Sequence, residues 1–294
     1  VAIYLFTRVA LGLCLTRKKN GKEQTTEDYF LAGKSLPWWT IAASLIAANI
    51  SAEQFIGMSG SGFAGGFAVA SYELMAALTL IIVAKFFLPI FIKQGIYTIP
   101  EFVEKRYSTQ LKTILAVFWL SLFIFINITS VLFLGGKAID TIIGVGDGSF
   151  IIPAIIILAI IAACYSLYGG LSAVAWTDVL QVVLLVIGGI LTTIVALQAV
   201  RPDGTILQGI QYVSERAGDR FDLILSKDNP EYQNLPGIMM LIGGLWVANL
   251  YYWGFNQYII QRAFAAKSLP EAQKGLIFAG FLKMLIPFIV VIPG

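Results

Sequence analysis

The sequence contains no histidine, only two cysteines and few charged residues. Without histidine, a Ser-His-Asp triad, a histidine metal site and a histidine proton relay are all excluded. The two cysteines, Cys14 and Cys164, both lie in apolar stretches and indicate packing rather than metal binding. No nucleophile and base are clustered either, so the sequence predicts neither an enzyme nor a bound cofactor.

Apolar residues are what the sequence has in excess. They make up 58% of the 294 residues, and charged residues only 13%. A soluble domain has about 45–50% apolar and about 25% charged residues, so one soluble core does not account for this composition. The net charge of +3 is too small to indicate nucleic acid as a partner. We therefore expect an all-α protein that lies in a lipid bilayer.

Apolar runs of the length that crosses a bilayer recur along the whole chain. A spanning helix needs about 20 such residues, and these runs are too long and continuous for the strands of a membrane barrel. Residues 1–15 precede Arg17, Lys18 and Lys19, the reverse of the order in a signal peptide, so we expect a membrane helix there. The predicted spans are 1–15, 38–57, 68–92, 112–136, 150–169, 176–199, 237–261 and 275–294.

The positive charges predict the orientation in the membrane. Lysine and arginine concentrate in loops 16–37 and 93–111 and after Arg262, which all fall on one side if the spans alternate. The other side has a turn at 58–67 and a long loop at 200–236, in which we expect a short surface helix. The positive-inside rule then places loop 16–37 in the cytoplasm and the N-terminus outside.

Two of the spans are unusual for lipid. The 38–57 span carries the polar run Asn49 to Gln54 at its centre, and the 237–261 span carries Gly243 and Gly244 followed by amides and aromatic residues. If the 38–57 span is counted as the first, the 237–261 span is the sixth, so the two are five spans apart. Interrupted helices at matching positions of two five-helix repeats point to the substrate site of a transporter. The alternative is that these polar residues join packed helices.

The spacing of the polar residues favours a lined cavity. Asn49 and Glu53 are four residues apart, so they share a face if the helix is continuous. A second stripe mixes amides with broad aromatic faces, and consists of Asn249, Tyr252, Trp253 and Asn256. Sugars need both kinds of group, since their hydroxyls bind amides and carboxylates while a ring face packs on an aromatic residue. An aromatic packing seam is the alternative.

Four ionisable residues within spans stand out, whereas Lys85 lies near the cytoplasmic end of its span and can snorkel. A charged side chain at the bilayer centre costs at least about 2.5–3.5 kcal/mol on insertion scales, so each is a candidate for function. They are Glu53, Glu73, Asp178 and Lys283. A pair formed by Glu73 and Lys283 would be neutral in the empty site and would open to hold hydroxyls. The alternative for each residue is a structural ion pair.

One short motif points in a different direction. Residues 60–65 match the dinucleotide fingerprint GxGxxG, which functions only between a strand and a helix. Here it lies between two membrane spans, so we expect its glycines to permit a turn and close helix approach instead.

Five longer stretches carry a resemblance to a known family. They are EDYFLAGKSLPWW (27–39), ASLIAANISAEQFIGMSGSG (43–62), GIYTIPEFVEKR (95–106), YGGLSAVAWTDVLQ (168–181) and GGLWVANLYYWGFNQYIIQR (243–262). In these stretches the chain closely resembles the sodium:solute symporter family, and most closely its bacterial sugar-carrying members. The resemblance covers nearly the whole chain.

The resemblance implies a fold and a membrane. The fold is the leucine-transporter-type five-plus-five inverted repeat, preceded by one extra N-terminal helix at 1–15. The first five-helix repeat would span 38–199, loop 200–236 would be extracellular, and 237–294 would begin the second repeat. The membrane would be the bacterial inner (plasma) membrane. The second repeat is unfinished at Gly294, so we expect the chain to be part of a longer protein.

The resemblance also implies residue roles. The sugar would be hydrogen-bonded by the residues Gln54, Glu73, Asn249 and Lys283. Tyr252 would stack on the sugar as an inner gate with Asn49 holding it, and Tyr72 and Trp253 would line the same cavity. Sodium would be bound by the carbonyls of Ala47 and Ile50, and Asp178 would lie near the route by which sodium leaves.

The sequence thus predicts a sodium-driven sugar symporter that uses alternating access. Its partners would be sodium, a sugar such as galactose or glucose, and the bilayer. Three alternatives stay open. A family member could carry inositol, proline or sialic acid, the scaffold could serve a channel or sensor, or the chain could be a membrane enzyme. A channel is the less favoured reading because the polarity is concentrated at mid-membrane rather than along continuous stripes.

Overall fold

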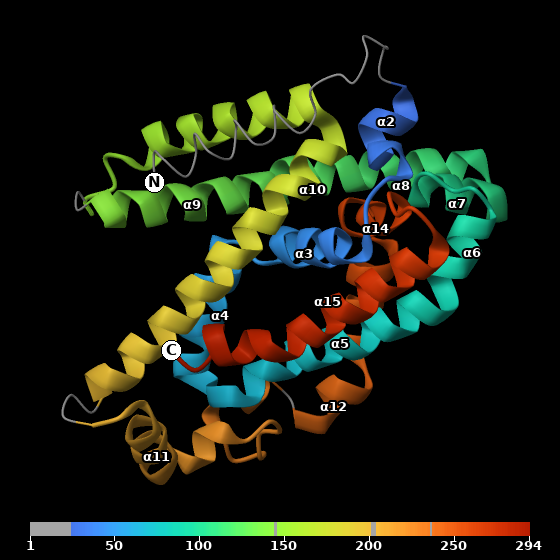
Figure 1. The fold of residues 1–294 in the computed structure, drawn as a ribbon. Helices are drawn as coiled ribbons and strands as arrows, with labels where there is room; N and C mark the ends of the chain where they lie inside the picture. The colour runs from blue at the N-terminus through green and yellow to red at the C-terminus, as the bar shows by residue number, and fades with distance from the viewer. Residues whose placement is uncertain (1–24, 144–145, 201–203, 236) are drawn as a thin grey trace.

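The computed structural model describes residues 25–143, 146–200, 204–235 and 237–294, and helices occupy most of them (Figure 1). The extra helix predicted at 1–15 lies outside the described residues. Among the described residues, four helical stretches are long and apolar enough to cross a membrane, and a bent pair around Gly243 would be a fifth. The four are Gln54–Lys93, Thr109–Ile143, Gly169–Val200 and Leu269–Val290.

The span predicted at 38–57 is interrupted, as expected. Helix α3 (Trp38–Asn49) ends where Ile50 and Ser51 become extended, and α4 (Ala52–Gly65) begins directly afterwards. The turn predicted at 58–67 is wrong for most of its length, because residues 58–65 belong to α4. The chain turns only at Gly66 (φ +73°).

The glycines of the GxGxxG sequence explain that error, since they lie on α4 rather than in a turn. A Cβ atom at Gly62 would lie 2.9 Å from the Val291 carbonyl oxygen, so this glycine permits the close helix approach that the sequence predicted. Because α3 rather than a strand precedes α4, the motif lacks the strand-to-helix geometry that binds a dinucleotide.

The next elements complete the first half of the chain. After the short 3-10 helix η2 (Gly66–Ala70) come α5 (Ser71–Ile82), the π-helical η3 (Val83–Phe87), α6 (Leu88–Lys93), α7 (Ile99–Arg106), α8 (Thr109–Leu122), the π-helical η4 (Phe123–Ile128) and α9 (Thr129–Ile143). The π-helical turns keep each apolar span continuous. The predicted loop 93–111 contains the short helix α7. Thr98 caps this helix by accepting a hydrogen bond from the Glu101 N–H (3.3 Å).

The spans predicted at 150–169 and 176–199 form one bent helix, α10 (Ile151–Val200), rather than two helices joined by a loop. The two arms make the V seen in Figure 1, with the bend at Gly170 (φ +55°, ψ −154°). The short helix α2 (Thr26–Leu31) packs against this bend, where the Tyr29 hydroxyl donates hydrogen bonds to the carbonyls of Ser166 and Leu167 at 3.3 Å each.

Replacing Gly170 by alanine should destabilise the protein by more than about 1–3 kcal/mol, the usual cost of a non-glycine residue in a disfavoured backbone region. The added Cβ would also lie 2.4 Å from the Tyr29 carbonyl oxygen, so α2 would have to move. Gly188→Ala on the same helix is the matched control, because nothing lies within 4 Å of its Cβ position. Thermal unfolding in detergent compares the two, and equal midpoints would contradict the role of this bend.

The second half begins with α11 (Ile206–Arg216), which confirms the short surface helix expected within loop 200–236. Two 3-10 turns follow, η5 (Gly218–Phe221) and η6 (Pro230–Gln233). The second interrupted span comprises α12 (Gly237–Ile242), α13 (Gly244–Leu250), the π-helical η7 (Tyr251–Phe255) and α14 (Gln257–Phe264), and α15 (Leu269–Val290) is the last helix. This second interrupted span breaks at Gly243 and again at Asn256, whose backbone is extended (φ −82°, ψ 119°).

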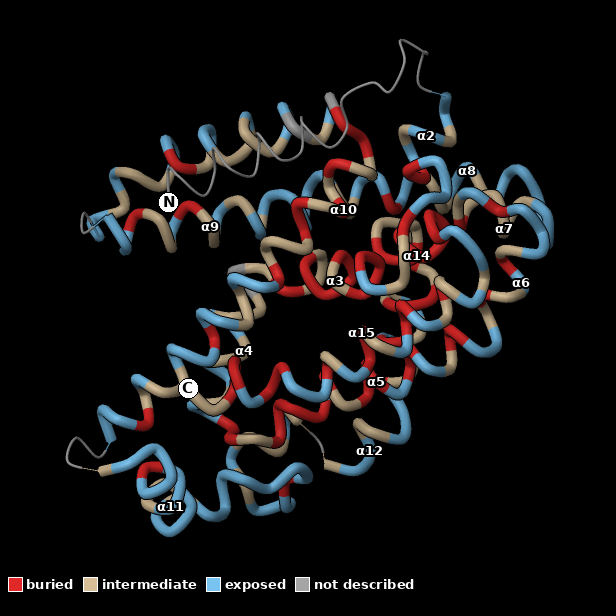
Figure 2. Tube along the Cα trace, in the orientation of Figure 1, coloured by how far each residue is buried: buried red, intermediate tan, exposed pale blue. Residues whose placement is uncertain are grey.

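The core lies where both interrupted spans meet α15. Figure 2 shows burial concentrated in α3, α14 and α15 and sparse along α9 and α10. Half of the residues in the apolar stretch of α15 are buried inside the protein, against 6% of those in the apolar stretch of 109–143. The outer helices therefore expose apolar side chains, including Ile114, Phe125 and Ile157, as a surface in contact with lipid does.

The polar ends of the helices gather at two opposite ends of the bundle. At one end, Lys34 pairs with Glu27 (3.0 Å) and lies over the Tyr97 ring, and the Phe30 carbonyl accepts a hydrogen bond from Gln261 (2.6 Å). These contacts join loops predicted to share one side of the membrane. At the other end, η2 packs against η5 of the long loop.

Candidate functional site

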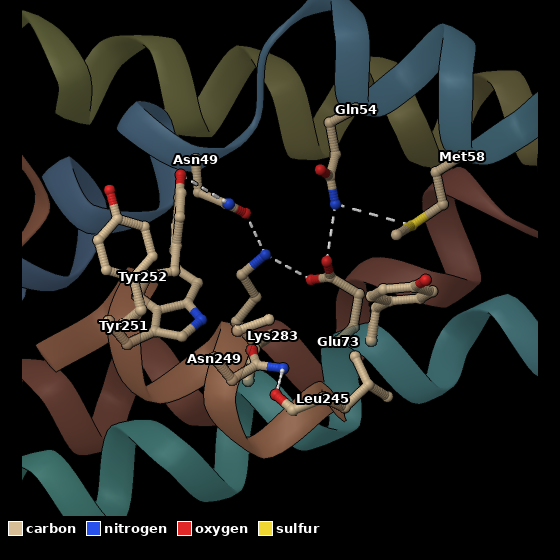
Figure 3. A pocket seen from close by; sticks show the side chains of 13 residues that line it. Asn49, Gln54, Met58, Glu73, Leu245, Asn249, Tyr251, Tyr252 and Lys283 are labelled. Carbon is tan, nitrogen blue, oxygen red and sulfur yellow. Dashed lines mark hydrogen bonds and ion pairs between the residues drawn. The ribbon is translucent and has the colours of Figure 1, made fainter. Parts of the chain in front are cut away.

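A pocket of about 350 Å³ lies between the two interrupted spans (Figure 3). Its walls come from the α3–α4 break, α5, α13, η7 and α15. The lining residues are Asn49, Gln54, Met58, Tyr72, Glu73, Ala76, Leu245, Ala248, Asn249, Tyr251, Tyr252, Trp253 and Lys283. Segments separated by up to 234 residues in sequence thus build a single site.

Lys283 is at the centre of this pocket. Its side chain is fully buried, and its ammonium lies 2.5 Å from Glu73 Oε2. The ammonium also donates a hydrogen bond to Asn49 Oδ1 and lies 5.2 Å from the centre of the Trp253 ring. Because a buried charge is tolerated only when it is paired and hydrogen-bonded, these contacts account for a lysine within the apolar helix α15.

Glu73 extends the network toward α4. It is buried in the first turn of α5, and its Oε1 accepts a hydrogen bond from Gln54 Nε2 at 2.7 Å. Asn249 on α13 donates to the Leu245 carbonyl at 3.0 Å. The pocket therefore contains a carboxylate, an ammonium and amide groups, which together both donate and accept hydrogen bonds.

Tyr252 joins the two broken helices on the other side of the pocket. Its hydroxyl accepts a hydrogen bond from Asn49 Nδ2 (3.1 Å) and lies 2.8 Å from the Tyr258 hydroxyl. Its ring meets Trp253 edge-on, with centroids 5.0 Å apart. The aromatic rings thus form one wall next to the polar groups (Figure 3).

The break between α3 and α4 leaves backbone oxygens available for a cation. The Ile50 N–H bonds to the Ile46 carbonyl at 2.8 Å, which is the last bond of the α3 ladder. Because Ile50 and Ser51 are extended, the helical ladder of α3 does not continue past this bond to the carbonyls of Ala47 and Ile50. Both residues are buried, so these oxygens fit a dehydrated cation better than lipid.

Asp178 lies outside the pocket, in a second buried cluster. Its Oδ2 accepts a hydrogen bond from the Ser44 hydroxyl (2.6 Å) and is 3.6 Å from Arg262 Nη2. Arg262 also donates to Ser44 Oγ (2.7 Å) and to the Tyr258 carbonyl. The cluster ties α3, the second arm of α10 and α14 together.

Most of the predicted site residues line the pocket, whereas Ala47, Ile50, Asp178 and Asn256 do not. Asn49 and Glu53 do not share a helix face, because the chain is extended between α3 and α4, and the Glu53 side chain lies outside the described residues. Asn256 does not line the pocket, because the π-helical turn of η7 shifts the register and brings Tyr251 there instead.

Sequence reasoning missed the partners of Asp178. Arg262 follows directly after a predicted span and is therefore assigned to a loop, and Ser44 carries no charge that would single it out. The available signal was the spacing of Tyr258 and Arg262, four residues apart on one helix face.

Comparisons with known proteins identify the family of this chain. The model of the sodium:solute symporter family matches residues 29–294. A sodium/glucose cotransporter of Vibrio parahaemolyticus is 61% identical over 293 residues, covering 100% of this chain and 53% of the relative. A human sodium/myo-inositol cotransporter is 33% identical, covering 100% of this chain and 42% of the relative. The chain thus spans about half the length of the curated relatives it matches.

Solved structures give the same fold. A Na⁺-coupled sialic acid symporter in a substrate-bound, outward-open state superposes with a TM-score of 0.81 and 24% sequence identity. The match covers 99% of this chain and 58% of that structure. The predicted all-α, leucine-transporter-type architecture of a multi-pass membrane protein is confirmed.

Proposed function

Because this chain belongs to the sodium:solute symporter family, we propose that it serves sodium-coupled symport of a sugar of the galactose or glucose type by alternating access. The observation that carries the proposal is the buried Glu73–Lys283 pair between two broken helices. We refer to the longer protein expected to contain this chain as the full-length protein.

The proposed sugar site is the pocket itself. The sugar hydroxyls would be hydrogen-bonded by Gln54, Glu73, Asn249 and Lys283, since the carboxylate accepts hydrogen bonds while the ammonium and the amide N–H groups donate them. In the structure, the Glu73 carboxylate and the Lys283 ammonium form an ion pair at 2.5 Å. A diol would replace that contact with hydrogen bonds to both groups, so neither charge would be left unpaired. Tyr252, Trp253 and Tyr72 would cover the ring, with Asn49 holding Tyr252.

Sodium is proposed to bind at the α3–α4 break through the carbonyls of Ala47 and Ile50, with Asp178 near its exit route. One charge falling through 100 mV contributes about 2.3 kcal/mol, and a tenfold sodium gradient about 1.4 kcal/mol. Their sum, about 3.7 kcal/mol, supports a sugar accumulation of about 500-fold per sodium ion.

We propose the topology from the positive-inside rule. Residues 38–199 form the first repeat, 237–294 begin the second, and 200–236 is an extracellular loop. The basic residues Lys34, Lys105 and Arg106 then lie on the cytoplasmic side of the bacterial inner membrane, with the N-terminus outside. The contacts of Lys34 with Glu27 and Tyr97 support one common side for these loops.

Uptake into proteoliposomes that contain the full-length protein tests the function. We expect an inward sodium gradient to drive accumulation of labelled galactose at least about tenfold above that with potassium, because the gradient energy above exceeds 1.4 kcal/mol. Labelled myo-inositol, proline and sialic acid are the matched comparisons. Sodium-driven uptake of one of these without galactose uptake would replace the sugar with that solute. Sodium-independent leakage of all four would indicate a channel.

A further inference from the structure

A second cavity, of about 240 Å³, lies next to the first at the loop end of α4. One wall is α4 itself, with Ser61, Ala64 and Gly65, and the other is the loop around η6, with Glu231 and Asn234. Tyr72 lines both cavities, and its side chain is 40% exposed. The second cavity is therefore separated from the first by little more than this ring, on the side that faces the long loop.

The polar groups of this cavity repeat the chemistry of the inner pocket. Glu231 Oε2 accepts a hydrogen bond from Asn234 Nδ2 at 2.7 Å. The other carboxylate oxygen of Glu231 has no hydrogen-bond partner among the residues that the structure describes. A carboxylate paired with an amide, beside a tyrosine ring and the apolar Leu235, suits a polyhydroxylated ring.

The loop wall is fixed against α4 and does not depend on a ligand for its position. Arg220 Nη1 donates to the Phe63 carbonyl (2.9 Å) and the Ala64 carbonyl (2.6 Å), the free carbonyls at the C-terminal end of α4. At Gly66, the Cβ position would lie only 2.4 Å from the Arg220 carbonyl oxygen, so the loop backbone sits directly on this turn. The long loop is thus anchored to the end of α4 at η5, and the η6 wall also lies close to α4, since the Gly65 Cβ position is 3.7 Å from Glu231 Cγ.

We propose that this cavity is an outer sugar-binding site, in which Glu231 and Asn234 hold a sugar before it passes Tyr72 into the inner pocket. The assignment of its ligand class rests on the proposed function. The inner pocket is lined by Asn49 and Gln54, which flank the α3–α4 break proposed to hold sodium, whereas the α4 residues that line the outer cavity begin at Ser61. Binding at the outer site should therefore be independent of sodium, which distinguishes it from the inner site.

Saturation-transfer difference NMR with D-galactose in sodium-free potassium buffer tests the outer site directly, because the method detects weak binding. The background is the full-length Glu73→Gln/Lys283→Met variant, which removes both charges of the inner pocket together. We expect a galactose signal in this background and at least a fivefold weaker signal when Glu231→Gln is added. The matched control is Asp228→Asn, an exposed carboxylate of the same loop that does not line the cavity, and should leave the signal intact.

Uptake kinetics give a second readout. In the otherwise unchanged full-length protein, Glu231→Gln should raise the KM for galactose about fivefold, with kcat and sodium activation within twofold of the wild type. Gly65→Val should do the same by filling the cavity, since the Gly65 Cβ position is 3.7 Å from Glu231 Cγ and from Leu235 Cδ1.

No galactose signal in the sodium-free background, or a signal unaffected by Glu231→Gln, would overturn the outer site while leaving sodium-driven uptake in place. A wild-type protein without sodium-driven galactose uptake would instead overturn the proposed function, and with it the sugar as the ligand of this cavity.

Discussion

Glu73→Gln should reduce sodium-driven galactose uptake by the full-length protein at least about 100-fold. The carboxylate is proposed to accept hydrogen bonds from sugar hydroxyls, and a hydrogen bond to a charged group contributes about 1.5–3 kcal/mol. Glutamine replaces one acceptor oxygen by an NH2 group and makes the other neutral, so one such bond is lost and the second is weakened, which together reach the roughly 2.7 kcal/mol that corresponds to 100-fold. Initial uptake rates in proteoliposomes with matched protein content provide the measurement.

The same substitution should also destabilise the protein by about 3–5 kcal/mol, because it leaves the ammonium of Lys283 without its counter-charge in a fully buried position. Adding Lys283→Met removes that unpaired charge, so the double variant should recover most of the stability without recovering uptake. This separation of stability from transport distinguishes a binding pair from a purely structural ion pair.

Glu104→Gln is the matched control for this prediction. Glu104 pairs with Lys112 at 2.6 Å, but both side chains are about one-third exposed, and such pairs contribute little. Its uptake and thermal midpoint should stay near those of the wild type. If Glu73→Gln transports galactose within twofold of the wild type, the proposed sugar site is wrong.

Asp178→Ala is expected to have the second largest effect. Arg262 is buried and has Asp178 as its carboxylate partner, with Ser44 bridging the two side chains. Removing the carboxylate leaves a buried guanidinium without its counter-charge, at a cost of about 3–5 kcal/mol. Because the cluster joins α3, α10 and α14, both broken spans lose a common attachment. We therefore expect a lower thermal midpoint and at least about a tenfold loss of uptake.

The milder Asp178→Asn variant separates structure from sodium handling. Asparagine keeps an oxygen that accepts the Ser44 hydrogen bond, but it leaves Arg262 without its counter-charge, so uptake by this variant is measured well below its own thermal midpoint. If Asp178 lies near the sodium exit route, the sodium concentration for half-maximal uptake should change in this variant. Asp147→Ala is the control, since Asp147 is exposed and bonds only to the nearby Ser149 N–H (2.9 Å) among the described residues. An unchanged sodium dependence in Asp178→Asn would remove this aspartate from the proposed sodium route.

The fold could be predicted from the sequence largely because lipid imposes simple rules. Apolar length marks the spanning helices, and the polar run beginning at Asn49 marks the first interruption. Continuity within apolar regions could not be predicted in the same way. Gly170 and the glycines of α4 all lie in apolar regions of the sequence. Gly170 bends its helix, whereas the glycines of α4 leave theirs unbroken. Which outcome occurs depends on tertiary contacts, such as that between Gly170 and Tyr29.

The candidate site was predictable to a different degree for each type of residue. Glu73 and Lys283 were identifiable because a charge within an apolar helix is costly and needs a partner. Their mutual contact depends on the packing of α5 against α15, which no local pattern reveals. The register around Tyr251 and Asn256 was missed because a π-helical turn changes which residues share a face. Arg262 was missed because hydropathy alone places a charge at the end of a span in water.

Two broken helices are proposed to enclose a sugar pocket, with sodium bound next to it at the α3–α4 break. An experimental structure of the full-length protein with galactose and sodium tests it most directly. We predict the sugar between Glu73 and Lys283, with its hydroxyls replacing the contact between these two side chains, and sodium at the carbonyls of Ala47 and Ile50. A loaded protein in which the Glu73–Lys283 pair stays closed and the sugar lies elsewhere in the bundle would contradict this claim.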